Sequence, residues 1–230
     1  MMAIVSLVIL VFLGFGMFAG AKQSEGFHEV SFKTADGGKI VANLYGKGSH
    51  AVILAHGAVF NKESWHDLAT TLSKEGFTVL ALGFRGYGKS LPGSQEQALY
   101  LDVLAAVEYL HTEGVKRISL IGGSMGGGAV ANAAVEAKEG EINSVILLSP
   151  VPIQTPEQMK AGKFLFIASR DEPLVSKVRE QYQRAPEPKA LKVLEGNAHA
   201  QHIFETNQAD ELTKIILAYL RQTYSLNLLP

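Results

Sequence analysis

One serine in this chain has neighbours that could make it a nucleophile. Ser124 lies between Gly122 and Gly126 in a G-x-S-x-G pattern, after the apolar run Ile118–Ile121 and before a run of small residues. A strand-to-helix turn this tight has no room for side chains at the two glycines, and it lifts the serine hydroxyl out of the strand end. The pattern predicts a nucleophile elbow. The competing interpretations are a glycine-rich turn with an idle serine and a phosphate-binding turn.

An acid and a base follow two later apolar runs. Asp171 comes just after Phe164–Ala168, and His199 comes shortly after Ala190–Leu194. A neutral serine is a poor nucleophile, so a histidine must accept its proton and later return it to the leaving group. A buried carboxylate fixes the tautomer of that histidine and stabilises its charged form. The residue types therefore predict that Ser124, His199 and Asp171 act together.

Each of these assignments has an alternative. Asp171 stands two residues before Pro173, where an aspartate can simply cap a helix. Glu172 is the alternative acid, with a longer side chain that needs a different reach. His202 competes with His199 as the base. A solvated loop residue is the ordinary interpretation of either histidine.

The order of apolar runs predicts how these residues are brought together. A hairpin signal at 35–38 joins two strand-like runs, and strands then alternate with helices. That order predicts an α/β fold with a mostly parallel, doubly wound sheet and an N-terminal antiparallel hairpin. Ligands bind beyond the carboxyl ends of such strands. We expect strands at 27–34, 39–45, 50–55, 77–82, 117–121, 145–148, 164–168 and 190–194, and helices at 64–74, 95–112, 173–184 and 203–221.

Serine, aspartate and histidine in this chain order, each just past a different strand, resemble the α/β-hydrolase superfamily from about Phe27 to Arg221. His56-Gly57 after the third strand is similar to the motif that supplies an oxyanion-hole amide in the serine-nucleophile branch. The resemblance implies that the backbone N–H groups of Ala58 and Met125 stabilise the oxyanion, and that His56 supports the loop. It favours His199 over His202 through the Gly196-x-x-His199 spacing.

Two departures from the family pattern stand out. The family often has D-x-R-G-x-G-x-S after the next strand, and here Gly83 replaces the aspartate while the run from Arg85 to Ser90 is kept. The residue between Gly122 and Ser124 is often bulky in relatives and is glycine here. The first departure concerns loop packing more than chemistry, and we expect the second to loosen the elbow.

The segment 83–90 is also a literal match to G-x-x-x-x-G-K-S, the phosphate-cradling loop of nucleotide hydrolases. That loop needs a helix that begins at its Lys-Ser pair. Here Leu91-Pro92-Gly93 follows and interrupts a helix within its first turn. We therefore do not assign nucleotide hydrolysis.

The N-terminal segment 1–21 has no charged side chain, and Ala19-Gly20-Ala21 offers small residues suited to a cleavage site. Its length approaches the roughly 20 residues that span a bilayer, and it lacks a basic start. We expect 1–21 to be a signal peptide or a membrane anchor, with cleavage preferred. The protein would then be secreted, periplasmic or tethered to a membrane, and the hydrolase domain would occupy 24–230.

Composition narrows the chemistry further. With 21 basic and 22 acidic residues the chain offers no electrostatic basis for nucleic-acid binding. The absence of cysteine excludes disulfides, a cysteine nucleophile and zinc–thiolate sites. The nearest histidine pair, His199 and His202, lacks carboxylates at ligand spacing. We expect neither a metal nor a cofactor.

Together these observations predict a serine hydrolase that cleaves carboxylic ester or thioester bonds of a small-molecule acyl substrate through an acyl-enzyme on Ser124. The stretch from Pro150 to Lys163 is too short for a large lid, so we expect an open, shallow site. Peptide or amide hydrolysis by the same site is the alternative activity. A non-catalytic binding module with this fold is the alternative of a different class.

Overall fold

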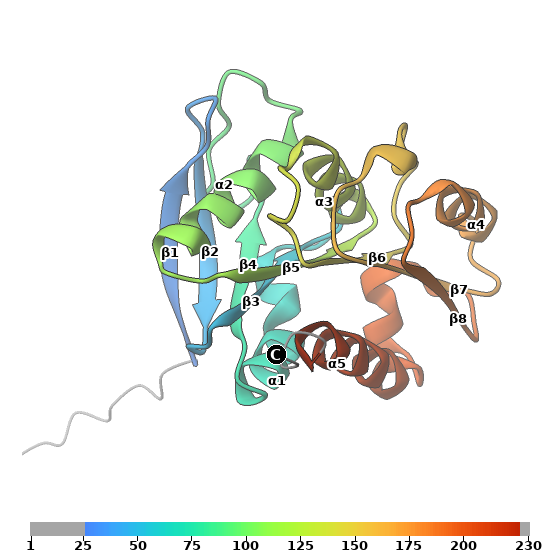
Figure 1. The fold of residues 1–230 in the computed structure, drawn as a ribbon. Helices are drawn as coiled ribbons and strands as arrows, with labels where there is room; N and C mark the ends of the chain where they lie inside the picture. The colour runs from blue at the N-terminus through green and yellow to red at the C-terminus, as the bar shows by residue number, and fades with distance from the viewer. Residues whose placement is uncertain (1–25, 226–230) are drawn as a thin grey trace, which may run out of the picture.

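The computed structural model describes residues 26–225, which fold around one eight-stranded sheet (Figure 1). The strand order across the sheet is β1-β2-β4-β3-β5-β6-β7-β8. Strand β2 pairs antiparallel with both β1 and β4, and the pairs from β3 to β8 are parallel, which confirms the predicted sheet and its N-terminal hairpin. The strands are β1 Phe27–Lys33, β2 Lys39–Tyr45, β3 His50–Ala55, β4 Thr78–Gly83, β5 Arg117–Gly123, β6 Ser144–Leu148, β7 Phe164–Ser169 and β8 Lys189–Leu194.

Helices cover both faces of the sheet. Figure 1 shows α2 (Leu99–Thr112), α3 (Met125–Glu136) and α4 (Val175–Arg184) on one face, with α1 (His66–Lys74) and α5 (Ala209–Ser225) on the other. Each face has its own apolar core, and the central strands β4 and β6 are buried along their whole length. Strands covered on both sides read as continuous apolar runs, which is why the sequence identifies them well.

Helices α1 and α5 begin later than the sequence predicts, because a 3₁₀ turn precedes each of them. Before α1 the turn Lys62–Trp65 is capped by Asn61, whose side chain accepts a hydrogen bond from the Ser64 N–H, so Ser64 is not the helix cap. Before α5 the turn Ala200–Glu205 occupies the start of the predicted helix. Short polar side chains that bond to nearby backbone favour such turns over regular helix.

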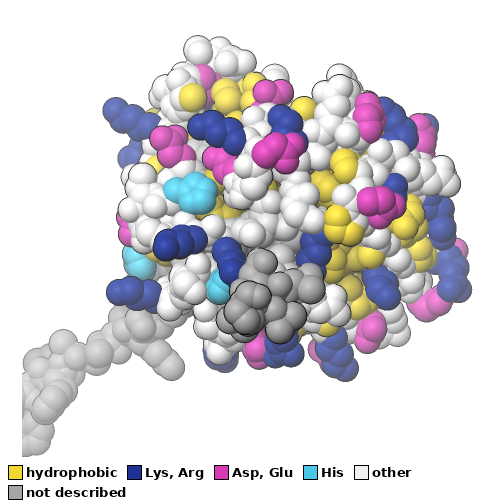
Figure 2. Space-filling view, viewed as in Figure 1, with side chains coloured by type: hydrophobic (Ala, Val, Ile, Leu, Met, Phe, Trp, Pro, Cys, Tyr) yellow, Lys and Arg dark blue, Asp and Glu magenta, His cyan; other side chains and the backbone are white. Residues whose placement is uncertain are grey.

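The predicted signal or anchor segment, 1–21, lies outside the described residues. None of the helices between residues 26 and 225 combines the length and the apolar character needed to cross a membrane. The only regular element in the connection between β6 and β7 is a 3₁₀ turn, Pro156–Gln158. On the face drawn in Figure 2, Lys, Arg, Asp and Glu side chains are intermixed, as the near-balanced charge of the chain leads one to expect.

Candidate active site

Ser124 occupies a strained turn between β5 and α3. Its backbone has φ 50° and ψ −113°, a positive φ that is uncommon for a residue other than glycine. A Cβ on Gly122 would lie 2.3 Å from the Gly126 carbonyl oxygen, and a Cβ on Gly126 would lie 2.2 Å from the Ala55 carbonyl oxygen. Both glycines are therefore required by close backbone approach, as the G-x-S-x-G pattern predicts.

His199 stands between Ser124 and a carboxylate. The Ser124 Oγ and the His199 Nε2 are 2.9 Å apart, and the His199 Nδ1 is 2.6 Å from an Oε2 oxygen of Glu172. Because a carboxylate only accepts hydrogen bonds, the Nδ1 carries the ring proton and the Nε2 is left to accept the proton of the serine hydroxyl. The imidazole thus has the tautomer that a general base for Ser124 requires.

The acid beside His199 is Glu172, and the prediction of Asp171 was wrong. Asp171 is exposed, and its backbone N–H donates to the Gly196 carbonyl at 2.9 Å. Glu172 is only 2% exposed and points back under the strand ends toward His199. Strand β7 ends at Ser169, and the turn that follows directs the second of the two adjacent acids inward. The glutamate side chain is one methylene longer than that of aspartate, and its carboxylate reaches the Nδ1 of His199.

Glu172 is held by two further groups. Its Oε1 accepts a hydrogen bond from the Ser149 hydroxyl and another, at 3.1 Å, from the Ser169 N–H. Ser149 is fully buried at the end of β6 and has a φ of 41°. Its side chain therefore faces the acid from a backbone conformation that non-glycine residues seldom adopt. Sequence reasoning missed Ser149, because a serine after an apolar strand carries no distinguishing motif.

The two predicted oxyanion amides belong to segments that pack directly on one another. Met125 is the first residue of α3, so its N–H lies in the turn where helical amides lack an intrahelical acceptor. Ala58 follows β3, and the contact between Gly126 and Ala55 brings this loop against the start of α3. Tyr87 joins the two segments, since its hydroxyl donates to the Ala58 carbonyl at 2.9 Å and lies 3.8 Å from the Met125 sulfur.

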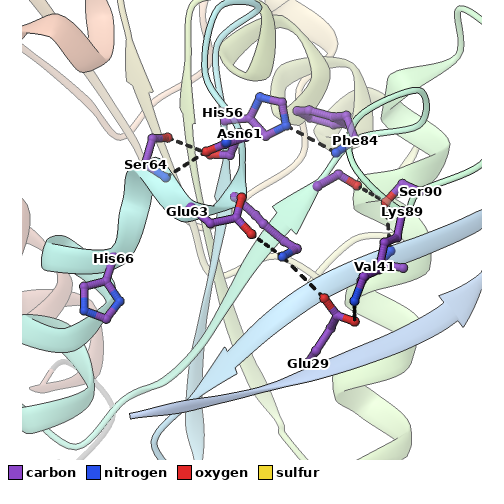
Figure 3. Close-up of polar contacts among 12 residues, drawn as sticks. Glu29, Val41, His56, Asn61, Glu63, Ser64, His66, Phe84, Lys89 and Ser90 are labelled. Atoms are coloured by element: carbon purple, nitrogen blue, oxygen red, sulfur yellow. Dashed lines mark hydrogen bonds and ion pairs between the residues drawn. The ribbon is translucent and has the colours of Figure 1, made fainter. Parts of the chain in front are cut away.

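His56 supports this loop through its ring nitrogens, one of which bonds to Phe84 (Figure 3). Its Nε2 accepts from the Phe84 N–H at 3.3 Å, so its Nδ1 carries the proton and donates to the Gly57 carbonyl at 2.9 Å. Burial lowers the pKa of His56 below 6.5, which favours this neutral form. The competing base, His202, is exposed and pairs with Glu205 at 2.9 Å.

The segment 83–90 is a structural loop. Arg85, 4% exposed, donates through its Nε to Asp102 at 2.8 Å and through a terminal nitrogen to Asp36 at 2.8 Å. The Ser90 hydroxyl donates to the Gly83 carbonyl and accepts from the Val41 N–H. Figure 3 shows Ser90 and Val41 next to Lys89. These contacts use the arginine and the serine for packing, so the phosphate-loop alternative finds no support.

A hollow of about 600 Å³ opens beside the loop that carries Ala58. Val59, Phe60 and Tyr87 form an apolar part of its wall, and Val59 is 80% exposed. Its far side carries charged residues that pair with one another: Glu29 lies 2.7 Å from Lys89 and 3.6 Å from Lys62. Within residues 26–225 no three histidine or acidic side chains converge on a point where a metal ion could bind.

Comparison with known proteins places these features in a family. A model of the alpha/beta hydrolase fold family matches residues 50–164, a range that includes Ala58, Ser124 and Met125. Among solved structures, the esterase Pf2001 of Pyrococcus furiosus superposes with a TM-score of 0.73 over 85% of this chain and 90% of its own, at 24% identity. At that identity the likeness is one of fold.

Two curated relatives are similar over about half of the chain. The bifunctional esterase/perhydrolase of Acinetobacter calcoaceticus is 31% identical over 123 residues, 52% of this chain and 44% of that protein. The multifunctional-autoprocessing repeats-in-toxin of Vibrio vulnificus is 36% identical over 141 residues, 59% of this chain and 2% of that protein. The chain thus spans less than half the length of both curated relatives.

Proposed function

Since this chain belongs to the alpha/beta hydrolase fold family, we propose that it is a serine hydrolase that cleaves carboxylic ester or thioester bonds through an acyl-enzyme on Ser124. The observation that carries the proposal is the continuous hydrogen-bonded line from Ser124 through His199 to Glu172. The esterase named among the solved structures and the esterase/perhydrolase named among the relatives agree with it.

In the proposed reaction the Ser124 Oγ attacks the acyl carbonyl carbon while the His199 Nε2 takes its proton. The carbonyl oxygen becomes an oxyanion that accepts hydrogen bonds from the N–H groups of Ala58 and Met125, each worth about 3–4 kcal/mol in the transition state. His199 then protonates the departing alkoxide or thiolate. A water molecule, deprotonated by His199, attacks the acyl-enzyme and releases the acid and the free serine. Glu172 keeps the ring oriented throughout.

The surroundings of Ser124 favour small or accessible acyl groups. The β6–β7 connection contributes only a short 3₁₀ turn, so the described residues include no lid domain over the serine. The exposed Val59 and the hollow beside Ala58 offer an apolar surface next to the proposed oxyanion site. A substrate with one end in bulk water fits this arrangement.

The first experiment is intact-mass analysis after treatment with a fluorophosphonate, which reacts with activated serines. We expect one adduct on the parent protein, none on Ser124→Ala, and an unchanged adduct on Ser31→Ala, which alters an exposed serine of β1. Short-chain p-nitrophenyl esters, a thioester and a peptide amide then give the preferred bond.

The outcomes separate the alternatives. An adduct at Ser124 together with preferred amide cleavage would reassign the chain as a peptidase or amidase. A folded parent protein that forms no adduct would sink the assignment of Ser124 as nucleophile, and it would leave a binding module as the better description.

A further inference from the structure

Gln201 is a buried polar residue two positions beyond His199, within the 3₁₀ turn that follows it. The side chain is 3% exposed, and both ends of its amide are used. Its Oε1 accepts a hydrogen bond from the Gly57 N–H at 2.6 Å, and its Nε2 donates to the Ser64 hydroxyl at 2.8 Å. One side chain therefore links the segment that carries the base to a loop more than 130 residues away in the sequence.

The two partners of Gln201 lie near the two ends of one closed loop, 56–64. At its start the Gly57 carbonyl accepts from the Phe60 N–H at 3.0 Å. At its end Asn61 and Ser64 bond to each other twice, once through each side chain (Figure 3). Ala58, the predicted oxyanion donor, lies within this loop. Gln201 thus fastens the loop at both ends, while the loop's own bonds hold its interior.

The glycine before the nucleophile makes room for this side chain. A Cβ on Gly123 would lie 3.2 Å from the Cγ of Gln201 and 3.5 Å from its Oε1, the first of which is tighter than an ordinary contact. Even a methyl group at 123 would therefore require the Gln201 side chain to shift by a few tenths of an ångström. The Gln201 side chain thus occupies the space that a side chain at position 123 would otherwise fill.

We propose that Gln201 is a positioning residue that keeps the backbone N–H of Ala58 at a fixed distance and orientation relative to the imidazole of His199. The proposal rests on the proposed serine hydrolase function. The Ala58 N–H must meet the oxyanion while His199 moves the proton, so the loop and the base must keep a fixed separation. A displacement of about 1 Å in such a constellation lowers the rate by roughly 100-fold. Gln201 joins the two segments directly and resists that displacement.

The test compares Gln201→Met with Gln183→Met, which makes the same change at an exposed position of α4. Both are assayed for kcat, KM and melting temperature with an ester that the parent protein hydrolyses, well below the melting temperature of either variant. We expect Gln201→Met to lower kcat by about tenfold or more with KM within about twofold, because the lost contact acts on oxyanion stabilisation. Gln183→Met should match the parent.

Ser64→Ala keeps the test decisive should Gln201→Met fail to fold. It removes the exposed partner of the Gln201 amide nitrogen, together with the hydrogen bond from the Ser64 hydroxyl to the Asn61 carbonyl, and should lower kcat about threefold. A double-mutant cycle adds an independent readout: Gly123→Ala should lower kcat more in the parent than in Gln201→Ala, where the tight contact with Cγ is gone.

Unchanged kcat in Gln201→Met or Ser64→Ala, with only a lower melting temperature, would show that the contact is merely structural. Additive effects of Gly123→Ala and Gln201→Ala would overturn the account of the shared volume. A parent protein without turnover or adduct would overturn the proposed function, and the role of Gln201 would fall with it. An active parent with an unaffected Gln201→Met variant would overturn only the role of Gln201.

Discussion

Glu172 places a charged carboxylate in the buried part of the site, where each of its oxygens needs a hydrogen-bond donor. Its carboxylate is completely buried, and it accepts hydrogen bonds from the Ser149 hydroxyl, the Ser169 N–H and the His199 ring. Burying a carboxylate is costly unless its oxygens are paired, and these three donors supply the pairing. The same donors fix which oxygen faces His199, so in the proposed mechanism Glu172 both orients His199 and stabilises its charged form.

At this scale we predict that Glu172→Gln lowers kcat for ester hydrolysis by roughly 10³–10⁴-fold, whereas Asp171→Asn leaves it within about twofold. The glutamine amide can present a donor to the Nδ1 of His199, which favours the wrong ring tautomer. Asp171 is exposed and its side chain serves neither Ser124 nor His199 through any hydrogen bond in the described structure. Steady-state kinetics of the two variants beside the parent is the measurement. A larger loss in Asp171→Asn than in Glu172→Gln would contradict the acid assigned here.

Between elements, the decisive contact is the start of α3 against the ends of β3 and β6. A Cβ on Gly126 would meet the Ala55 carbonyl oxygen at 2.2 Å, and a Cβ on Gly127 would meet Pro150 at 2.9 Å. The helix can approach the sheet this closely only because these positions lack side chains. The same approach sets Met125 beside the loop of Ala58, so the packing of one helix terminus builds the proposed oxyanion site.

We predict that Gly126→Ala costs about 3 kcal/mol of unfolding free energy, the upper end of the usual range for overpacking, because the added methyl group must displace backbone rather than a movable side chain. The matched control is Asn132→Ala, which places the same residue at an exposed position of the same helix and should change stability by less than about 0.5 kcal/mol. Urea unfolding followed by circular dichroism gives both values. Equal stability of the two variants would mean that α3 does not pack on β3 as described.

Across the whole molecule, Arg85 ties together three parts that are distant in sequence. Its guanidinium group lies between Asp36, in the turn of the β1–β2 hairpin, and Asp102, in the first turn of α2. The side chains of all three residues are at most 3% exposed. The Arg85 guanidinium beside Asp36 lowers the pKa of that carboxyl well below its usual range, while burial raises the pKa of Asp102.

Removing one member of this cluster should destabilise the entire domain. We predict that Asp102→Asn lowers the unfolding free energy by about 3 kcal/mol, the lower end of the range for a broken buried ion pair, because Asp36 still compensates part of the Arg85 charge. Glu108→Gln, an exposed change on the same helix, is the control and should have almost no effect. Chemical denaturation is the assay, and a change below about 1 kcal/mol in Asp102→Asn would contradict a structural role for the cluster.

The sequence by itself determined the sheet, the tight turn at Ser124 and the choice of His199 as the partner of that serine. Continuous apolar runs such as β3 and β6 report burial on both faces, and a tight turn admits only glycine at 122 and 126. These features depend on local sequence and short-range sterics, so they can be read along the chain. The assignment of His199 over His202 also agrees with the geometry, since only His199 bonds to Ser124.

Only the tertiary structure decided which acid faces His199 and what fills the space beside the elbow. Asp171 and Glu172 are neighbours of the same charge, and the direction of each depends on how the turn after β7 meets the buried Ser149. The contacts of Gln201 with Gly57 and Ser64 cross more than 130 residues. Such contacts are fixed by the packing of separate segments, and no local pattern in the chain encodes them.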